Sequence, residues 1–153
     1  MTDDTAANID EGYEARGATK TATSYRTWLF SGGWPRMDGW PAKNVHTDLE
    51  FARDSGLAAR NASGAMMAGY LTELMVDTFG EGWLRNGAFS LKFIRAVGIG
   101  DRVTAMARVA SKRVVGSGTG FEAEVWCENQ DGDKVVVGTA RVQTAGSPKG
   151  APG

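Results

Sequence analysis

The chain has 153 residues, of which 42% are hydrophobic and 23% are charged. This composition is typical of a soluble globular protein, and the length suits one domain that buries a substantial core. Seventeen basic and eighteen acidic residues give a formal net charge of −1 without a long run of either sign. We therefore expect neither a nucleic-acid partner nor binding to an anionic membrane surface.

Cysteine and histidine each occur once, as Cys127 and His46. A single cysteine excludes an intramolecular disulfide, and we expect Cys127 to be an inert residue of the core. A typical zinc site needs several ligands of these two types, so we expect no metal and no other cofactor.

Both ends of the chain, residues 1–19 and 146–153, are polar or small and are predicted to be mobile tails. This leaves residues 20–145 as a single domain. The start lacks the basic and apolar regions of a signal peptide, and no apolar run approaches the ~20 residues of a membrane span. The expected location is the cytoplasm, with no membrane partner.

The first part of the domain has mixed patterns. Residues 21–30 are expected to form a short extended or helical segment that ends at Ser31-Gly32-Gly33. The prolines and glycines of residues 33–43 then predict a long loop. Thr47-Asp48 is a plausible N-cap for a helix of about two turns over residues 49–55, which Gly56 would end.

Apolar residues recur at three- and four-residue steps over residues 63–79, which predicts one long helix with an apolar stripe. Its start is rich in small residues, so a ligand or another backbone can come close there. Gly80 is expected to end it.

From residue 87 onward the apolar residues alternate, which predicts half-buried strands over residues 89–93, 103–109, 119–128 and 134–143. Asp131-Gly132 is a hairpin turn signal, and residues 116–120 are read as a flexible hairpin connection rather than a phosphate loop. The expected fold class is α+β, an antiparallel sheet wrapped around one long helix. Such a sheet has an open edge, so we expect a homodimer at least.

Several short motifs resemble the MaoC-like (R)-specific enoyl-CoA hydratases and dehydratases, which have the hot-dog fold. The resemblance spans residues 21–143. It is carried by Phe30-Ser31-Gly32, Val45-His46-Thr47-Asp48, Ala62-Ser63-Gly64, Val97-Gly98-Ile99-Gly100-Asp101 and Gly138-Thr139-Ala140.

The resemblance implies that His46 is the catalytic base and that the Gly64 amide, with Ser63 beside it, binds the developing oxyanion. The family also has an aspartate after Ser-Gly, but here Gly33 follows Ser31-Gly32 and about eight extra residues precede His46. Either Asp38 within this insertion replaces the carboxylate, or His46 has no carboxylate partner. Ser63 has the alternative role of helix N-cap, Gly64 that of close helix packing, and Asp38 that of a solvated turn residue.

Bulky residues of the long loop, namely Trp34, Met37 and Trp40, are predicted either to cover a substrate as a lid or to fill a dimer interface. Asn44 and Met67 are the other candidates for substrate contact.

The expected activity is that of a lyase, a hydratase or dehydratase acting on an enoyl or 3-hydroxyacyl thioester or a similar activated carbonyl compound. A neutral imidazole suits the base because its unperturbed pKa is ~6.5. Two alternatives remain open. One is a non-catalytic hot-dog subunit or ligand-binding protein, and the other is a related lyase or isomerase acting on a small apolar metabolite that is not a CoA ester.

Overall fold

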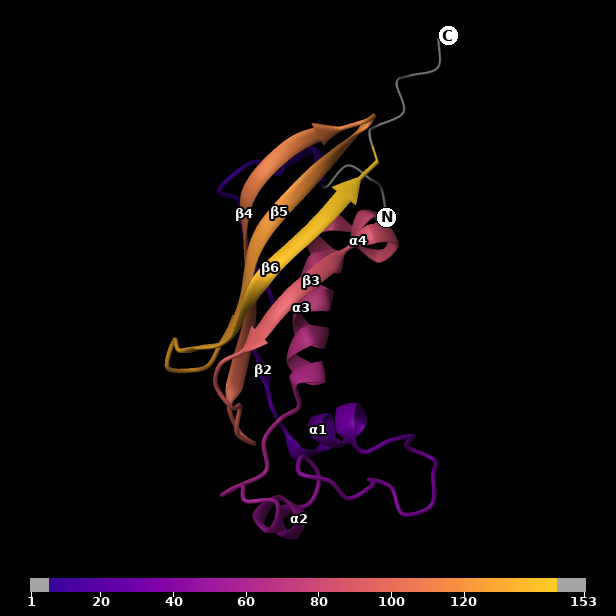
Figure 1. Cartoon of the computed structure of the whole chain (residues 1–153), viewed down its shortest axis with the longest axis vertical. Helices are drawn as coiled ribbons and strands as arrows, with labels where there is room; N and C mark the ends of the chain where they lie inside the picture. Colours follow the sequence, from indigo (N-terminus) through magenta and orange to yellow (C-terminus); the bar gives the residue numbers. More distant parts are fainter. Residues whose placement is uncertain (1–5, 146–153) are drawn as a thin grey trace.

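The computed structural model describes residues 6–145 as a twisted sheet with one long helix across its inner face (Figure 1). The helices are η1 (Ala6–Asn8), α1 (Ser24–Ser31), α2 (Leu49–Asp54), α3 (Gly64–Phe79) and α4 (Glu81–Asn86). The strands are β1 (Glu14–Arg16), β2 (Lys20–Thr21), β3 (Ala88–Phe93), β4 (Arg102–Val115), β5 (Gly118–Glu128) and β6 (Lys134–Thr144).

The sheet is antiparallel with the strand order β1-β4-β5-β6-β3, and β2 pairs with β4 beside this path. Side chains alternate between a buried inner face and a charged outer face, where pairs such as Arg108 and Glu124 lie opposite each other. The α+β class and all four predicted strands are confirmed, and β4 continues six residues beyond the predicted end at residue 109.

The core lies between the sheet and α3. The buried residues of α3 fall on one stripe, which includes the fully buried Met66, Leu71 and Met75, and they pack with inward-facing valines of the strands. Gly80 has a φ of +56° and its N–H donates to Val76 O, which ends the helix as predicted. A further helix, α4, follows directly and was not predicted, because its six residues are too few for a periodic pattern.

The N-terminal segment differs from the prediction. Residues 6–19 were expected to be part of a mobile tail, but Ile9 and Ala15 are buried in the core and β1 pairs with β4. The prediction failed because the segment is polar by composition, and its order depends on a strand edge that lies some ninety residues away in the sequence. Residues 1–5 and 146–153, which include the predicted C-terminal tail, lie outside the described residues.

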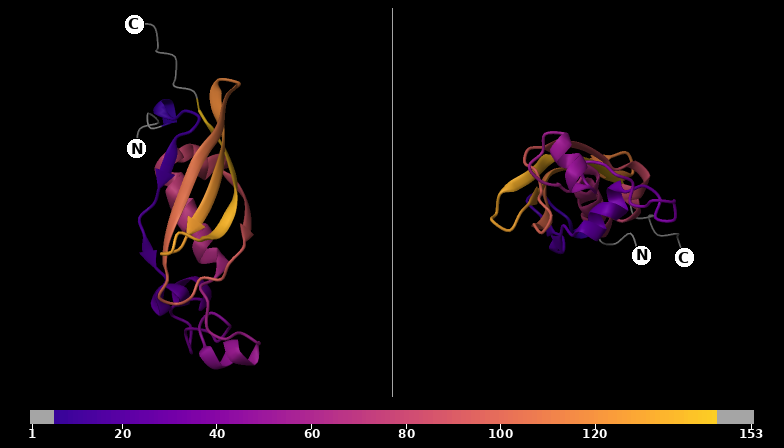
Figure 2. Two further views of the ribbon diagram at one scale, coloured as in Figure 1. Left: turned by 90° about the vertical axis from the view of Figure 1, so that its left-hand side faces the viewer. Right: turned by 90° about the horizontal axis from the view of Figure 1, so that it is seen from below.

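Beyond one end of the sheet, α1, α2 and their connecting segments form a separate lobe below the N-terminus of α3 (Figures 1 and 2). His46 belongs to this lobe and Gly64 to the helix above it. Within residues 6–145, no helix has the length and apolar character needed to cross a bilayer.

Candidate active site

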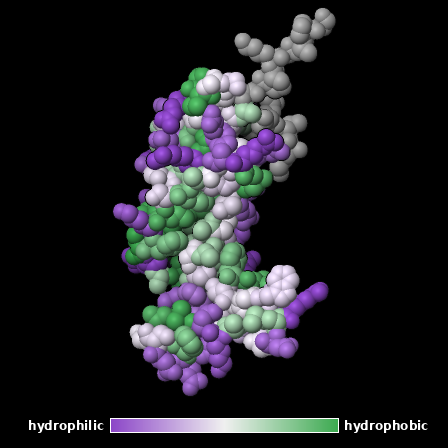
Figure 3. Space-filling view, turned by 45° about the vertical axis from the view of Figure 1, so that its right-hand side comes forward, coloured by the Kyte–Doolittle hydropathy of each residue, from purple (hydrophilic) through white to green (hydrophobic). Residues whose placement is uncertain are grey.

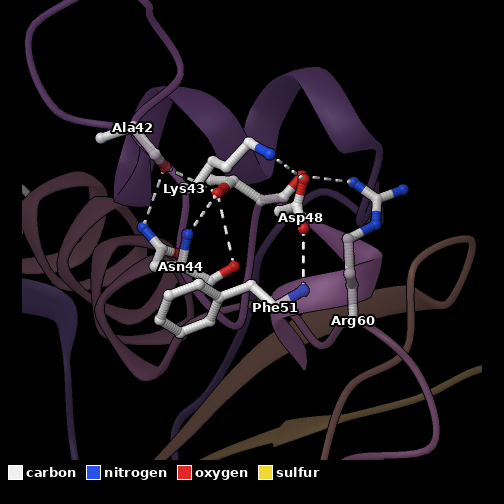
Figure 4. A network of polar contacts seen from close by, with 7 residues as sticks. Ala42, Lys43, Asn44, Asp48, Phe51 and Arg60 are labelled. Atoms are coloured by element: carbon white, nitrogen blue, oxygen red, sulfur yellow. Dashed lines mark hydrogen bonds and ion pairs between the residues drawn. The ribbon is translucent and has the colours of Figure 1, made fainter. Parts of the chain in front are cut away.

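His46 lies on a tight turn that Asn44 holds together. The Asn44 side chain accepts a hydrogen bond from His46 N at 2.9 Å and donates one to Ser31 O, at the end of α1, at 2.7 Å. The Thr47 hydroxyl donates to Ala42 O at 2.7 Å and accepts from Asn44 N at 3.0 Å (Figure 4 shows this network from nearby). The side chains of Asn44 and Thr47 therefore hold the turn in place. Both the oxygen and the nitrogen of the Asn44 side chain are engaged in these hydrogen bonds.

The His46 ring is half-buried, and its Nδ1 lies 2.8 Å from the carbonyl oxygen of Asn61. A carbonyl oxygen only accepts hydrogen bonds, so Nδ1 carries the proton in this contact. In the neutral ring the lone pair is then on Nε2, and this is the atom that can take a proton from a substrate.

Asn61 also connects the histidine to the start of α3. It pairs with Gly98 in an isolated β-bridge, and Ala62 N donates to Val97 O at 2.8 Å. These two hydrogen-bonded contacts bring together two motifs of the family resemblance. One contains Val97-Gly98, and the other contains Ser63-Gly64 at the start of α3. Asp101 supports these contacts because its carboxylate accepts from Gly98 N at 2.8 Å.

The start of α3 presents free donors. Ser63 is buried and is the N-cap, with its hydroxyl oxygen 3.4 Å from Met66 N. Gly64 is the first residue of the helix, and among the described residues no backbone acceptor meets its N–H. An unpaired amide at the positive end of a helix dipole is suited to stabilise a negative oxygen.

A cavity of about 290 Å³ lies beside this helix start. Asn61, Gly64 and Met67 line it together with residues that follow β3, among them Ile94 and Val97. The Phe93 ring closes one side, because a Cβ added at Gly64 would lie 2.9 Å from Phe93 Cε1. Gly64 and the residue whose carbonyl holds the His46 ring thus line the same cavity, whereas His46 is not among the residues that line it.

The long loop over residues 33–43 closes on itself. Ala42 N donates to Gly32 O at 2.8 Å, so the chain returns to the end of α1. Trp40 packs edge-on against Tyr25 and Trp28, with ring centroids 6.2 and 6.1 Å away, and its Nε1 donates to Gly33 O. This is why the longer loop still allows Asn44 to reach Ser31.

The other two large residues of the loop are exposed, Trp34 at 72% and Met37 at 43% of their surface. The loop extends outward from α1 in Figure 1, and the residues that line the cavity beside Gly64 come from elsewhere in the described chain. The lid and interface roles of Trp34, Met37 and Trp40 stay predictions.

Within residues 6–145, neither Asp38 nor Asp48 makes a hydrogen bond or ion pair with His46. Asp38 is exposed in the loop and makes no hydrogen bond or ion pair with the rest of residues 6–145. Asp48 caps α2 by accepting from Phe51 N at 2.8 Å and lies 3.7 Å from Lys43 Nζ. The Phe51 N–H is the main reason that the pKa of the Asp48 carboxyl lies below its usual value. The only contact described for the His46 ring is therefore with a neutral carbonyl group.

Two residues of this site carry no signal in the sequence. Asn61 contacts the His46 ring through its backbone carbonyl, which every residue has. The Arg60 side chain donates to Thr47 O and to the Ser24 hydroxyl, which are distant from it in the sequence. The resemblance located Ser63-Gly64 and His46, but it gave no reason to consider the two residues that connect them.

Residues 6–145 thus form an α+β protein in which an antiparallel sheet wraps one long helix, with a half-buried histidine and an unpaired helix-start amide beyond one end of the sheet. A family model described as "MaoC like domain" matches residues 42–125, which is more than half of the chain. The protein therefore belongs to the MaoC-like family of hydratases and dehydratases.

Solved structures agree on the fold. A MaoC-like dehydratase from Rhodospirillum rubrum is 20% identical with a TM-score of 0.74, over 93% of this chain and 97% of that one. An unliganded R-hydratase from Pseudomonas aeruginosa is 22% identical with a TM-score of 0.70, over 97% of this chain and 96% of that one.

A Mycobacterium tuberculosis protein described as having a double hotdog fold is 12% identical with a TM-score of 0.68, over 96% of this chain and 46% of that one. The predicted hot-dog fold is confirmed, and this chain corresponds to about half of the double protein. No curated protein matches the sequence.

Proposed function

We propose that the protein is a hydratase or dehydratase of an enoyl or 3-hydroxyacyl thioester, with His46 as the general base. The proposal is carried by one observation. The Asn61 carbonyl holds Nδ1 of His46, which leaves Nε2 as the basic atom, and Asn61 lines the same cavity as Gly64.

In the dehydration direction, Nε2 of His46 removes the proton from C2 of the substrate. The electrons move to the thioester oxygen, which the Gly64 N–H stabilises, and Ser63 lies beside it as a second donor. The electrons then return from the enolate oxygen and form the C2–C3 double bond as the C3–O bond breaks, and the imidazolium passes its proton to the departing hydroxyl group, which leaves as water. One imidazole thus makes both proton transfers, which suits a histidine whose described ring contact is a carbonyl rather than a carboxylate.

The cavity favours a short or compact acyl group. About 290 Å³ lies at the lower end of the ~300–1,000 Å³ that is typical of small-molecule sites. Met67 on its wall is flexible and apolar, which suits contact with an acyl chain. None of Trp34, Met37 and Trp40 lines this cavity, so we propose that the loop that carries them covers the part of the thioester outside it. We propose Asn44 as a residue that supports the substrate site through the His46 turn.

The test is the turnover of short enoyl-CoA substrates such as crotonyl-CoA by the wild type and by His46→Gln. Loss of a general base lowers kcat by about 10²–10⁴-fold, and we expect a loss in this range while the variant keeps the wild-type unfolding temperature. Unchanged turnover in His46→Gln would remove the catalytic assignment.

A second candidate is a non-catalytic subunit or ligand-binding protein of the same fold, which the lack of a described carboxylate contact at His46 favours. In that case the folded wild type is inactive on every enoyl thioester until a partner hydratase is added. Activity only on a small apolar carbonyl compound would instead identify a related lyase or isomerase.

We also propose that the chain forms a homodimer in the cytoplasm. The strand β3 is at the edge of the sheet, and Phe93 and Ile94 at its end are more than half exposed. The face seen in Figure 3 exposes apolar residues across its middle. Pairing with a second copy would cover such an edge. Sedimentation equilibrium should then give twice the chain mass of 16.3 kDa.

A further inference from the structure

Arg60 and Asn61 form a short segment that contacts the His46 turn at two points. The Asn61 carbonyl accepts from the His46 ring at 2.8 Å, and Arg60 Nη1 donates to Thr47 O at 3.3 Å. Since Thr47 follows His46 and Asn61 follows Arg60, the two hydrogen bonds lie next to each other and join the same two segments, residues 46–47 and 60–61.

The Arg60 guanidinium has a second contact that fixes its own position. Its Nη2 donates to the Ser24 hydroxyl at 3.0 Å, at the first residue of α1. The group is half-buried, and two hydrogen bonds from a charged, planar donor hold a geometry better than a single flexible contact does. Arg60 therefore links α1, the His46 turn and the segment before α3 to one another. Figure 4 shows the Arg60 side chain beside the turn that carries Asn44 and Asp48.

We propose that Arg60 is a positioning residue that keeps the His46 ring on the Asn61 carbonyl and so fixes its protonated nitrogen. This inference rests on the proposed role of His46 as a base. A neutral imidazole has two tautomers, and only the one with the proton on Nδ1 offers a lone pair on Nε2 to the substrate. The Asn61 carbonyl oxygen selects this tautomer by accepting from Nδ1, so no carboxylate is needed. The position of this carbonyl depends on Arg60.

The experiment uses the full-length chain labelled with ¹⁵N and free of any histidine tag. His46 is its single histidine, so a long-range ¹H–¹⁵N spectrum contains one imidazole. At about pH 8.5, where an unperturbed imidazole is neutral, we expect a protonated Nδ1 and an unprotonated Nε2 in the wild type.

The main variant is Arg60→Met, which keeps the length of the side chain and removes its donors. We expect ¹⁵N shifts that report a mixture of tautomers, and a fall in kcat of about 10–100-fold with unchanged KM, because the base is misplaced while the substrate still binds. Arg60→Lys keeps one charged donor and should recover part of both effects. The matched control is Arg53→Met on α2, where the side chain is exposed and makes no hydrogen bond or ion pair with the described residues, and its spectrum and kcat should equal those of the wild type.

Several results would overturn the inference. A wild-type ring protonated on Nε2 would show that the Asn61 carbonyl does not hold it. An unchanged spectrum in Arg60→Met would show that the carbonyl acts alone. If Arg60→Met does not fold, Ser24→Ala removes the second acceptor and should give a smaller shift of the same kind, and an unchanged spectrum there also rejects Arg60. Failure of the proposed function is seen separately, as unchanged turnover in His46→Gln, and it leaves the tautomer result intact.

Discussion

Adding one methyl group at Gly64 separates the chemical role of this residue from its packing role, because α3 contains a second glycine in the same kind of environment. A Cβ at Gly64 would lie 2.9–3.3 Å from the Phe93 ring, and a Cβ at Gly69 would lie 3.0–3.2 Å from the Phe30 ring. Both rings are about half exposed, at 55% for Phe93 and 45% for Phe30. Gly64→Ala and Gly69→Ala therefore make the same change against the same kind of neighbour, but only Gly64 borders the cavity.

The expected effect on stability is small for both variants. Replacing glycine by alanine in a helix contributes about 0.5–1 kcal/mol by restricting the unfolded chain. The atoms contacted are the outer edges of half-exposed rings, which can rotate away, so the cost should be below the ~1–3 kcal/mol of overpacking in a closed core. The free energy of unfolding should change by no more than about 1 kcal/mol, or about 2–4 °C in Tm for a chain of this size.

The expected effect on activity is large for Gly64→Ala alone. Its methyl group would push the Phe93 ring away from its place at the cavity wall and so disturb the approach of a substrate oxygen to the amide, and loss of such a donor lowers kcat by about 10²–10³-fold. The assay is the change in enoyl thioester absorbance with crotonyl-CoA, measured beside thermal unfolding. The reasoning is refuted if Gly64→Ala keeps wild-type kcat, or if Gly69→Ala loses as much activity as Gly64→Ala does.

Two further predictions concern the body of the fold. A Cβ at Gly138 on β6 would collide with the backbone oxygen of Ser90 on β3, which cannot rotate away, so Gly138→Ala should lower the free energy of unfolding by about 2–4 kcal/mol. Urea unfolding tests this, with the exposed neighbour Thr139→Ala as the control, and a loss no larger than that of the control would contradict it. Burial raises the pKa of the Cys127 thiol to about 12, so at pH 8 the group stays protonated as well as shielded. An aromatic disulfide reagent should therefore label Cys127 only after unfolding, and rapid labelling of the native protein would show that the core around it opens.

Local patterns in the sequence determined the elements that build the core. The strands and α3 were predictable because each buries one face, and burial imposes an apolar period of two residues on a strand and of about 3.6 on a helix. The caps Asp48 and Ser63 were predictable for a similar reason, since each contact joins a side chain to an amide three residues later. His46 and Gly64 became candidates through short motifs. The structure places the His46 ring on the Asn61 carbonyl, and Asn61 and Gly64 line one cavity.

Tertiary structure alone decided how these parts meet. The order of residues 6–19 depends on the edge of β4. The long loop over residues 33–43 brings the chain back to α1 before the His46 turn because Ala42 N donates to Gly32 O across its base. The acceptor of the His46 ring is a backbone carbonyl fifteen residues away, held by an arginine that also reaches α1. Every residue has a carbonyl group, so composition and spacing cannot mark the one that acts, and only the folded path of the chain brings it to the ring.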